Sequence, residues 1–214
     1  MLRVMRWLLV CLALAVPAAA QQKEPIGPFV VDLRAVYGRH KVEPSVATEL
    51  GVESGNLPTR SLGFLGGTHV YPWRTQKINV GFGGSFIHTR GSRALDIENA
   101  DGTITQSPTV RRYFTAITPE VSLNFGHRSG WSYVSGGFFG RAKLYMDRED
   151  APVTEAPYRK TLHYGGGARW FTTDHLAFSV DFRWYSVAEQ LQTGTVIAQP
   201  RTTLLVLSGG VSFK

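Results

Sequence analysis

Apolar and polar residues alternate along most of this 214-residue chain, in segments of about ten residues that are each followed by turn-forming residues. A period of two places successive side chains on opposite faces of a β-strand. Helical periodicity is hard to find beyond the first twenty residues. We therefore predict an all-β chain with eight strands. Their ranges are 29–38, 61–71, 77–89, 113–126, 131–145, 162–171, 176–185 and 203–213.

The charged residues of several predicted strands fall on one face, and large apolar residues fill the other. A Lys or Arg that faces lipid at the bilayer midplane costs about 2–4 kcal/mol. A soluble sheet shows the opposite arrangement, with charges on its exposed face. We therefore expect the apolar faces to point outward and the charges to point inward. The charge pairs that share a face are Asp32 with Arg34, Arg141 with Lys143, and Asp181 with Arg183.

The connections between the predicted strands alternate between long and short. Outer-membrane barrels have short periplasmic turns and longer extracellular loops. The pattern predicts an eight-stranded antiparallel up-and-down transmembrane β-barrel with both termini in the periplasm. A lipocalin, the soluble eight-stranded alternative, would have a charged exterior and an apolar interior. The connections are 39–60, 72–76, 90–112, 127–130, 146–161, 172–175 and 186–202.

One of the long connections contains a further hairpin signal. Asp101-Gly102 is a dipeptide typical of tight turns, and it separates the short segments 94–99 and 103–106. Pro119 falls inside a predicted strand, although a closed barrel has no free edge to accommodate a residue without an N–H group. We therefore expect a bulge at Pro119, or a fourth strand that begins after it.

The first twenty residues have the pattern of a secretory signal peptide. Arg3 and Arg6 precede an apolar run over 7–16, and Ala18-Ala19-Ala20 forms a small-residue cleavage site. We divide the chain into a signal peptide, 1–20, and a barrel domain, 21–214. Cys11 is the only cysteine, so cleavage leaves none. It also leaves 21 basic and 16 acidic residues, a net charge of +5, and an exported basic protein is not expected to meet nucleic acid.

The inward charges predict a structural salt-bridge network. Side chains just fill the interior of an eight-stranded barrel, and buried charges must pair. The glycine pairs within five strands predict relief of crowding inside the narrow barrel. In the alternative interpretation, the same charges gate a narrow pore that prefers anions. The network residues are Asp32, Arg34, Glu120, Arg141, Lys143, Arg169, Asp181 and Arg183.

The segment 165–185 resembles small outer-membrane barrels of the OmpA/OmpX-like kind. It has a glycine-rich strand, Gly165-Gly166-Gly167-Ala168-Arg169, then a short turn with Asp174, then a strand that ends Asp181-Phe182-Arg183. The last strand, ending Val211-Ser212-Phe213, looks like the signal that such proteins present to the barrel-assembly machinery. The resemblance implies an outer-membrane monomer in contact with lipid and lipopolysaccharide. We expect no peptidoglycan-binding domain after the barrel.

The resemblance does not select one activity, because this fold hosts several functions. We expect a structural or surface-interaction role for a barrel with a polar, salt-bridged lumen. The alternatives are the gated channel and a lipid-A-modifying enzyme. For the enzyme, His88 faces outward near the extracellular rim, but no Ser adjoins it and a His-x-Ser-Asn motif is absent. We expect no catalytic residue, cofactor or metal site.

Aromatic residues are predicted to form two girdles around the barrel, one at each membrane interface. The expected girdle at the periplasmic ends of the strands contains Phe29, Trp73, Trp131 and Trp170, and that at the extracellular ends contains Tyr37, Tyr113, Tyr145 and Trp184.

Overall fold

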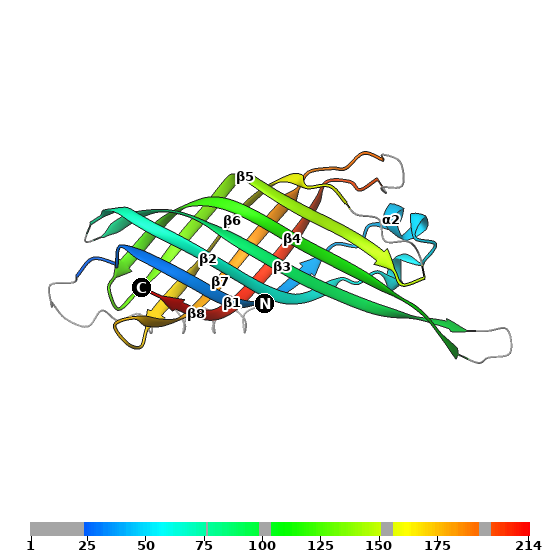
Figure 1. Ribbon diagram of the computed structural model, residues 1–214, viewed down its shortest axis with the longest axis horizontal. Coiled ribbons are helices and arrows are strands. Elements are labelled where there is room, and N and C mark those ends of the chain that lie inside the picture. Colours follow the sequence, from blue (N-terminus) through cyan, green and yellow to red (C-terminus); the bar gives the residue numbers. More distant parts are fainter. Residues whose placement is uncertain (1–23, 76, 99–103, 151–155, 193–197) are drawn as a thin grey trace, which may run out of the picture.

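The computed structural model describes residues 24–75, 77–98, 104–150, 156–192 and 198–214. Eight antiparallel strands follow one another around a closed barrel, and β8 pairs with β1 (Figure 1). The predicted eight-stranded antiparallel up-and-down barrel is confirmed. The predicted signal peptide, 1–20, lies outside the described residues. The strands are β1 (Phe29–His40), β2 (Arg60–Arg74), β3 (Ile78–Glu98), β4 (Ile104–His127), β5 (Gly130–Arg148), β6 (Arg159–Phe171), β7 (Leu176–Val187) and β8 (Thr202–Phe213).

The strands β3 and β4 are much longer than predicted. Their pairing continues outward until Glu98 faces Ile104, so the described parts of the segments predicted as a separate hairpin, 94–98 and 104–106, are extensions of the two strands. The predicted Asp101-Gly102 tip lies outside the described residues. This hairpin projects from one end of the barrel, at the right of Figure 1.

The two ends of the barrel differ in the length of their connections, as the sequence predicted. The end with the short connections, which we call the turn end, also carries the C-terminal Lys214 (Figure 1). The opposite end, the loop end, carries the β3–β4 hairpin and the segment between β1 and β2. That segment contains the short helix α2 (Pro44–Glu49) and the 3₁₀ turn η1 (Ser54–Asn56). No helix in the described part of the chain is long and apolar enough to cross a membrane.

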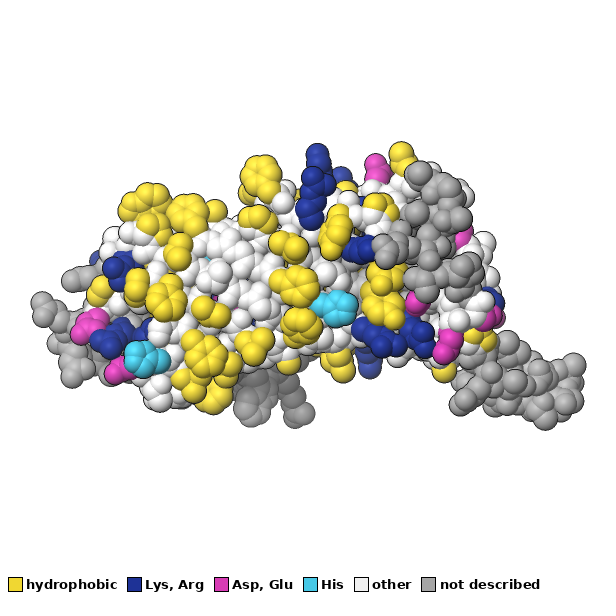
Figure 2. All heavy atoms as spheres, in the orientation of Figure 1, with side chains coloured by type: hydrophobic (Ala, Val, Ile, Leu, Met, Phe, Trp, Pro, Cys, Tyr) yellow, Lys and Arg dark blue, Asp and Glu magenta, His cyan; other side chains and the backbone are white. Residues whose placement is uncertain are grey.

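The outer surface of the barrel is apolar over its middle and charged mainly toward its ends (Figure 2). This face pattern is the one predicted for a barrel in lipid. One member of the predicted girdles is misplaced, because Trp131 is buried inside the barrel. Exposed apolar side chains of the belt include Val31, Leu33, Phe64, Val70, Phe82, Phe86, Ile117, Val121, Leu123, Val134, Phe178, Val180 and Leu207.

Each proline inside a strand lies where the pairing of the strands shifts by one residue. The shift between β2 and β3 includes Pro72, and the shift between β3 and β4 includes Pro108. Pro119 lies in the shift between β4 and β5, so of the two alternatives expected there the bulge is confirmed, and the later start of the fourth strand is wrong. A proline cannot donate to the ladder, so a closed sheet accommodates it where the ladder is already interrupted.

At Pro119 the extra residue belongs to β5. Phe138 and Phe139 both point outward there, 79% and 85% exposed, whereas side chains elsewhere in the strand alternate. The β5–β6 pairing shifts at the same two residues.

This bulge corrects the sequence prediction for the second half of β5. Arg141 and Lys143, expected in the lumen, lie on the outer face, and Ala142 and Leu144, expected outside, are buried in the lumen. One extra residue reverses the face of every residue that follows it, because the side-chain period is two. The prediction was wrong here because it continued one alternation through the bulge.

Deleting Phe139 should leave the faces of the rest of β5 unchanged, because Phe138 and Phe139 both point outward and removing one of them restores strict alternation. Both pairings of β5 would become regular, at the cost of a ladder hydrogen bond missing at Pro119. We therefore expect the deletion variant to keep the folded band that resists SDS and shifts in electrophoretic mobility on boiling. Inserting one alanine after Phe139 should instead turn Arg141 and Lys143 into the lumen and Leu144 outward, and should abolish that band. A deletion variant without the band, or an insertion variant with wild-type stability, would contradict this account of the bulge.

Candidate functional site

The lumen is filled by four successive layers of side chains. An aromatic cluster closes the turn end, and an ionic layer lies next to it. A mainly apolar layer follows, and a cap that includes α2 covers the loop end. The aromatic cluster contains Ile26, Val30, Tyr71, Trp131 and Tyr133, with Phe171 packed against it.

In the ionic layer, carboxylates and guanidiniums alternate in one continuous chain. Arg169 of β6 donates two hydrogen bonds to Asp32 of β1, from Nε at 3.1 Å and from Nη2 at 2.6 Å. Arg34 follows, with Nη2 2.8 Å from Asp32 and Nη1 3.3 Å from Asp181 of β7. Arg183 continues the chain from Asp181, at 2.7 Å, to Glu120 of β4, at 2.8 Å.

These six groups are 4% exposed or less, and their three negative and three positive charges cancel. Hydroxyl groups complete the coordination of the chain. Ser212 and Tyr133 donate to Asp32 and Asp181, and Ser179 accepts from Arg34. Buried ions need both opposite charge and hydrogen bonds to offset their lost hydration.

Two histidines that the sequence prediction left out of the network lie at Glu120. His163 Nε2 lies 3.0 Å from one carboxylate oxygen, and His69 Nε2 lies 3.1 Å from the other. Both carry the inward parity of their predicted strands, so the alternation alone could have included them. A carboxylate can only accept, so the hydrogen bond between His163 and Glu120 is donated from Nε2 of the histidine.

Glycines make room for this layer. Most of the charged side chains lie directly across a strand pair from a glycine: Asp32 from Gly67, Arg34 from Gly210, Glu120 from Gly83, Asp181 from Gly167, and Arg183 from Gly165. The two histidines follow the same rule, with His69 facing Gly83 and His163 facing Gly137. A Cβ on Gly83 would come within 2.8 Å of the His69 ring. The glycine pairs therefore reduce crowding, as the sequence predicted.

The apolar layer separates the ionic layer from the loop end. Every strand except β6 contributes to this layer, and its side chains are almost completely buried. Phe114 packs edge-on against Tyr185, with ring centres 5.4 Å apart. These side chains pack against one another inside the lumen, between the ionic layer and the loop end. The layer consists of Val36, Leu65, Ile87, Phe114, Ala116, Ala142, Leu144, Tyr185, Val187, Leu204 and Val206.

The cap at the loop end is built on α2. Val46 and Ala47 of this helix pack on Val110 and Met146 of the barrel wall. Below the cap, the buried Arg112 donates from Nη1 to the Lys41 carbonyl oxygen, at 3.1 Å. The cap is therefore held by both apolar contact and a charged hydrogen bond.

The turn end is closed from outside by Lys214. Its ammonium lies 3.7 Å from the centre of the Phe171 ring and donates to the Arg128 carbonyl oxygen. Partial burial lowers the pKa of this ammonium, and the neighbouring Arg128 lowers it further. Arg128 itself pairs with Glu24 and Asp174, so charged groups cover the aromatic cluster.

Of the eight residues predicted for the lumen network, the structure brings six together. Asp32, Arg34, Glu120, Arg169, Asp181 and Arg183 form the ionic layer. Arg141 and Lys143 lie outside, where Lys143 Nζ is 5.9 Å from the Tyr145 ring centre and 5.8 Å from that of Tyr158.

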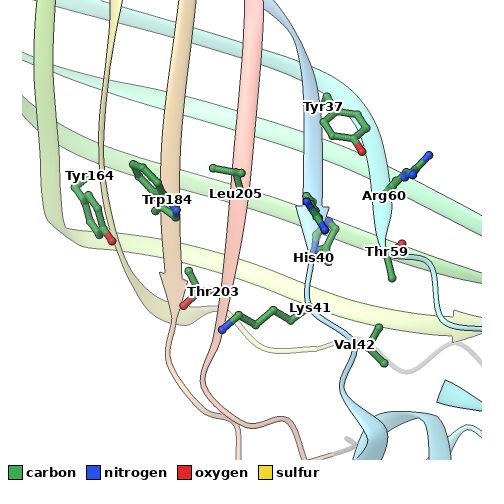
Figure 3. Close-up of a pocket in the computed structure, with 11 residues that line it drawn as sticks. Tyr37, His40, Lys41, Val42, Thr59, Arg60, Tyr164, Trp184, Thr203 and Leu205 are labelled. Atoms are coloured by element: carbon green, nitrogen blue, oxygen red, sulfur yellow. The ribbon is translucent and has the colours of Figure 1, made fainter. Parts of the chain in front are cut away.

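The outer wall carries a groove of about 1050 Å³ near the loop end (Figure 3). It crosses β6, β7, β8, β1 and the start of β2. Tyr164 and Trp184 form one end of it, with ring centres 5.4 Å apart, and Arg39, Lys41 and Arg60 form the other. A smaller apolar hollow of about 330 Å³ adjoins it at Tyr37.

The enzyme alternative gains no support at His88. The ring is half-buried on the outer face, and its Nδ1 lies 2.8 Å from the Thr115 hydroxyl. No acidic partner for His88 occurs among the interactions of the described residues, and no group of three His, Cys, Asp or Glu residues there could hold a metal ion.

The closed eight-stranded barrel, apolar outside and polar inside, defines the class to which this fold belongs, the small outer-membrane barrels. The chain is similar to Neisserial surface protein A, with a TM-score of 0.50 and 14% identity, over 88% of this chain and 97% of that one. It also aligns with OprG from Pseudomonas aeruginosa (TM-score 0.48, 10% identity, 91% and 98% covered). Ail of Yersinia pestis gives a TM-score of 0.46 with 16% identity, over 88% and 99%. No protein-family model and no curated protein matches the sequence.

The two arginines Arg169 and Arg141 should respond very differently to neutralisation. Arg169→Gln should lower the free energy of unfolding by about 3–5 kcal/mol, because it leaves Asp32 short of its bidentate partner in a buried site. Arg141→Gln should change it by no more than about 0.5 kcal/mol, because that side chain is exposed. Guanidinium titrations of the protein folded in micelles would measure both. Equal losses would show that Arg141 is a lumen residue after all.

Proposed function

We propose that this protein is a closed, non-conducting barrel of the outer membrane with a structural or surface-interaction role. The observation that carries the proposal is the lumen. Its ionic layer is charge-balanced. The aromatic cluster lies on one side of this layer, and the apolar layer and the cap lie on the other. A channel needs a continuous hydrated path through its lumen. A lumen filled with packed side chains supports a structural role more than a role in transport. What varies on such a scaffold is the outer wall and the loops.

We further propose an outer-membrane location with the turn end in the periplasm and the loop end outside. The apolar belt supports a membrane location, and the alternation of short and long connections supports the orientation. Kinship with OmpA/OmpX-like barrels, a monomeric state, insertion by the barrel-assembly machinery and absence of enzymatic activity belong to the same proposal. The partners it implies are outer-membrane lipid and lipopolysaccharide.

The surrounding charges suit the loop end to an anionic leaflet. Exposed basic residues occur there on several strands, among them Arg39, Arg60, Arg90, Arg93 and Arg141. Each basic residue close to an anionic membrane surface contributes about 1 kcal/mol of attraction. The barrel would therefore be held at a fixed depth, with its loops presented above the lipid.

In planar bilayers, the purified barrel should give no single-channel steps at any moderate voltage, because the apolar layer leaves no continuous water path. Conductance recordings beside an open porin would measure this. Reproducible steps carried mainly by anions would overturn the proposal and favour the gated-channel alternative.

Single cysteines should report the orientation, since Cys11 lies in the predicted signal peptide and is the only cysteine. Glu53→Cys at the loop end should react with a membrane-impermeant maleimide on intact cells. Asp174→Cys at the turn end should react only after the outer membrane is opened. Both residues are exposed, so the comparison is matched. The reverse pattern would exclude the proposed orientation, and labelling of both on intact cells would exclude the proposed location of the turn end.

A further inference from the structure

We propose that the groove and the hollow on the outer wall together bind one phosphate-bearing anionic lipid, with its headgroup in the groove and an acyl chain in the hollow. The inference rests on the proposed function in one respect, that this wall faces a bilayer. It goes further by assigning a discrete site to one face of the barrel.

The groove is built on a single row of outward side chains. Pairing across successive strands joins Tyr164 to Trp184, Trp184 to Leu205, Leu205 to Arg39, and Arg39 to Arg60. Five neighbouring strands about 4.8 Å apart give the row a length of roughly 20 Å. Figure 3 shows Tyr164, Trp184, Leu205 and Arg60 in this order. The row passes from aromatic through aliphatic to cationic.

The cationic half of the row is fixed in place by the barrel. The His40 backbone N–H donates to the Thr59 carbonyl oxygen at 2.8 Å, which holds the end of β1 against the start of β2. Arg112 holds the Lys41 carbonyl from inside the lumen. The backbones that carry Arg39, Lys41 and Arg60 are therefore positioned before any ligand binds.

The charge of the groove is unbalanced. Three exposed cations line it, and none of its lining residues is acidic. Among the ion pairs of the described residues, none involves Arg39, Lys41 or Arg60. Three basic side chains without a carboxylate suit a phosphate group, and guanidiniums bind its oxygens in pairs.

The apolar hollow beside the groove favours a lipid over a soluble anion as the ligand. It adjoins the groove at Tyr37 and extends toward the middle of the barrel, over Leu62 and Leu207. Its floor is low because two small residues, Ala35 and Gly209, face each other across β1 and β8. An apolar slot directly beneath a cationic groove matches a molecule with a phosphate at one end and hydrocarbon at the other.

The aromatic half fits the same depth in the membrane. Tyr164 is 53% exposed, and Trp184, stacked on it, is half-buried. Tyrosine and tryptophan favour the level of lipid headgroups, because one part of the ring is apolar and another is polar. The row therefore lies where a headgroup meets its acyl chains.

The test uses the folded barrel, residues 21–214, in nanodiscs of phosphatidylcholine doped with phosphatidic acid. Native mass spectrometry would count the lipids that stay bound after release from the disc. The wild-type barrel should retain phosphatidic acid in preference to phosphatidylcholine. The triple variant Arg39→Gln, Lys41→Gln, Arg60→Gln should lose that retention by about tenfold or more.

The matched control removes the same charge from other strands at the same end, with Arg90→Gln, Arg93→Gln and Arg141→Gln. It should lower retention by less than about twofold, because screened attraction alone is at stake there. Gly209→Leu would fill the hollow, since the nearest atom to a Cβ placed there is 3.9 Å away. It should weaken retention of the lipid while the barrel still shifts on boiling.

Equal losses in the two triple variants would overturn the site and leave only general surface attraction. Equal retention of phosphatidylcholine and phosphatidic acid would overturn it too. Displacement of the lipid by inorganic phosphate would show an anion site without a lipid and overturn the assignment. The lipid counts do not depend on the orientation of the barrel in a cell. A cysteine-labelling pattern other than the expected one would therefore contradict the proposed location, while the lipid site would still be tested by retention in nanodiscs.

Discussion

The alternating chain of charges across the lumen is the interaction on which the rest of the barrel depends. Six buried ions without partners would destabilise the folded barrel strongly, since removing one partner of a buried pair costs about 3–5 kcal/mol of folding free energy. They are tolerable because each carboxylate accepts from at least two guanidinium, hydroxyl or imidazole donors. Their partners come from β1, β4, β6 and β7, so the network can form only when the barrel has closed in one register.

The same network explains features of the wall that have no charge. Glycines face the charged side chains across the strand pairs because a Cβ there would collide with a neighbouring strand or with the ionic side chains, as at Gly165 beside Arg183. Apolar and aromatic side chains pack on either side of the ionic layer, and a low local dielectric strengthens charge pairing. Packing around the ions therefore decides where the wall carries small residues.

The outer wall of the barrel is adapted to lipid as its solvent. In lipid, all backbone polar groups must be paired, and a closed barrel achieves this without an edge. The prolines show the limit of that rule, because each lies at an interrupted part of the ladder. The β5 bulge also moves Arg141 and Lys143 out of the lumen, so a backbone defect that accommodates Pro119 alters the charge of the surface.

Much of this architecture could be predicted from the sequence, because strand alternation is local. Two charged residues two positions apart, such as Asp181 and Arg183, share one face of a strand and are enough to assign that face. Turn residues are enough to separate one strand from the next. The bulge at Pro119 was also predictable, since the missing N–H is a property of one residue. Its consequence for Arg141 was not, because the sequence does not say which of two paired strands carries the extra residue.

By itself, the sequence determined the number of strands and the inward and outward faces of most of them, and it predicted eight lumen charges, of which six form the ionic layer. Only the tertiary structure decided which charge pairs with which, that His69 and His163 lie at Glu120, and that an apolar layer packs inside the lumen beside the ionic layer. It also decided that Tyr164, Trp184, Leu205, Arg39 and Arg60 form one row. The physical reason is that faces follow from the geometry of a single strand, whereas contacts depend on the register between strands far apart in the chain.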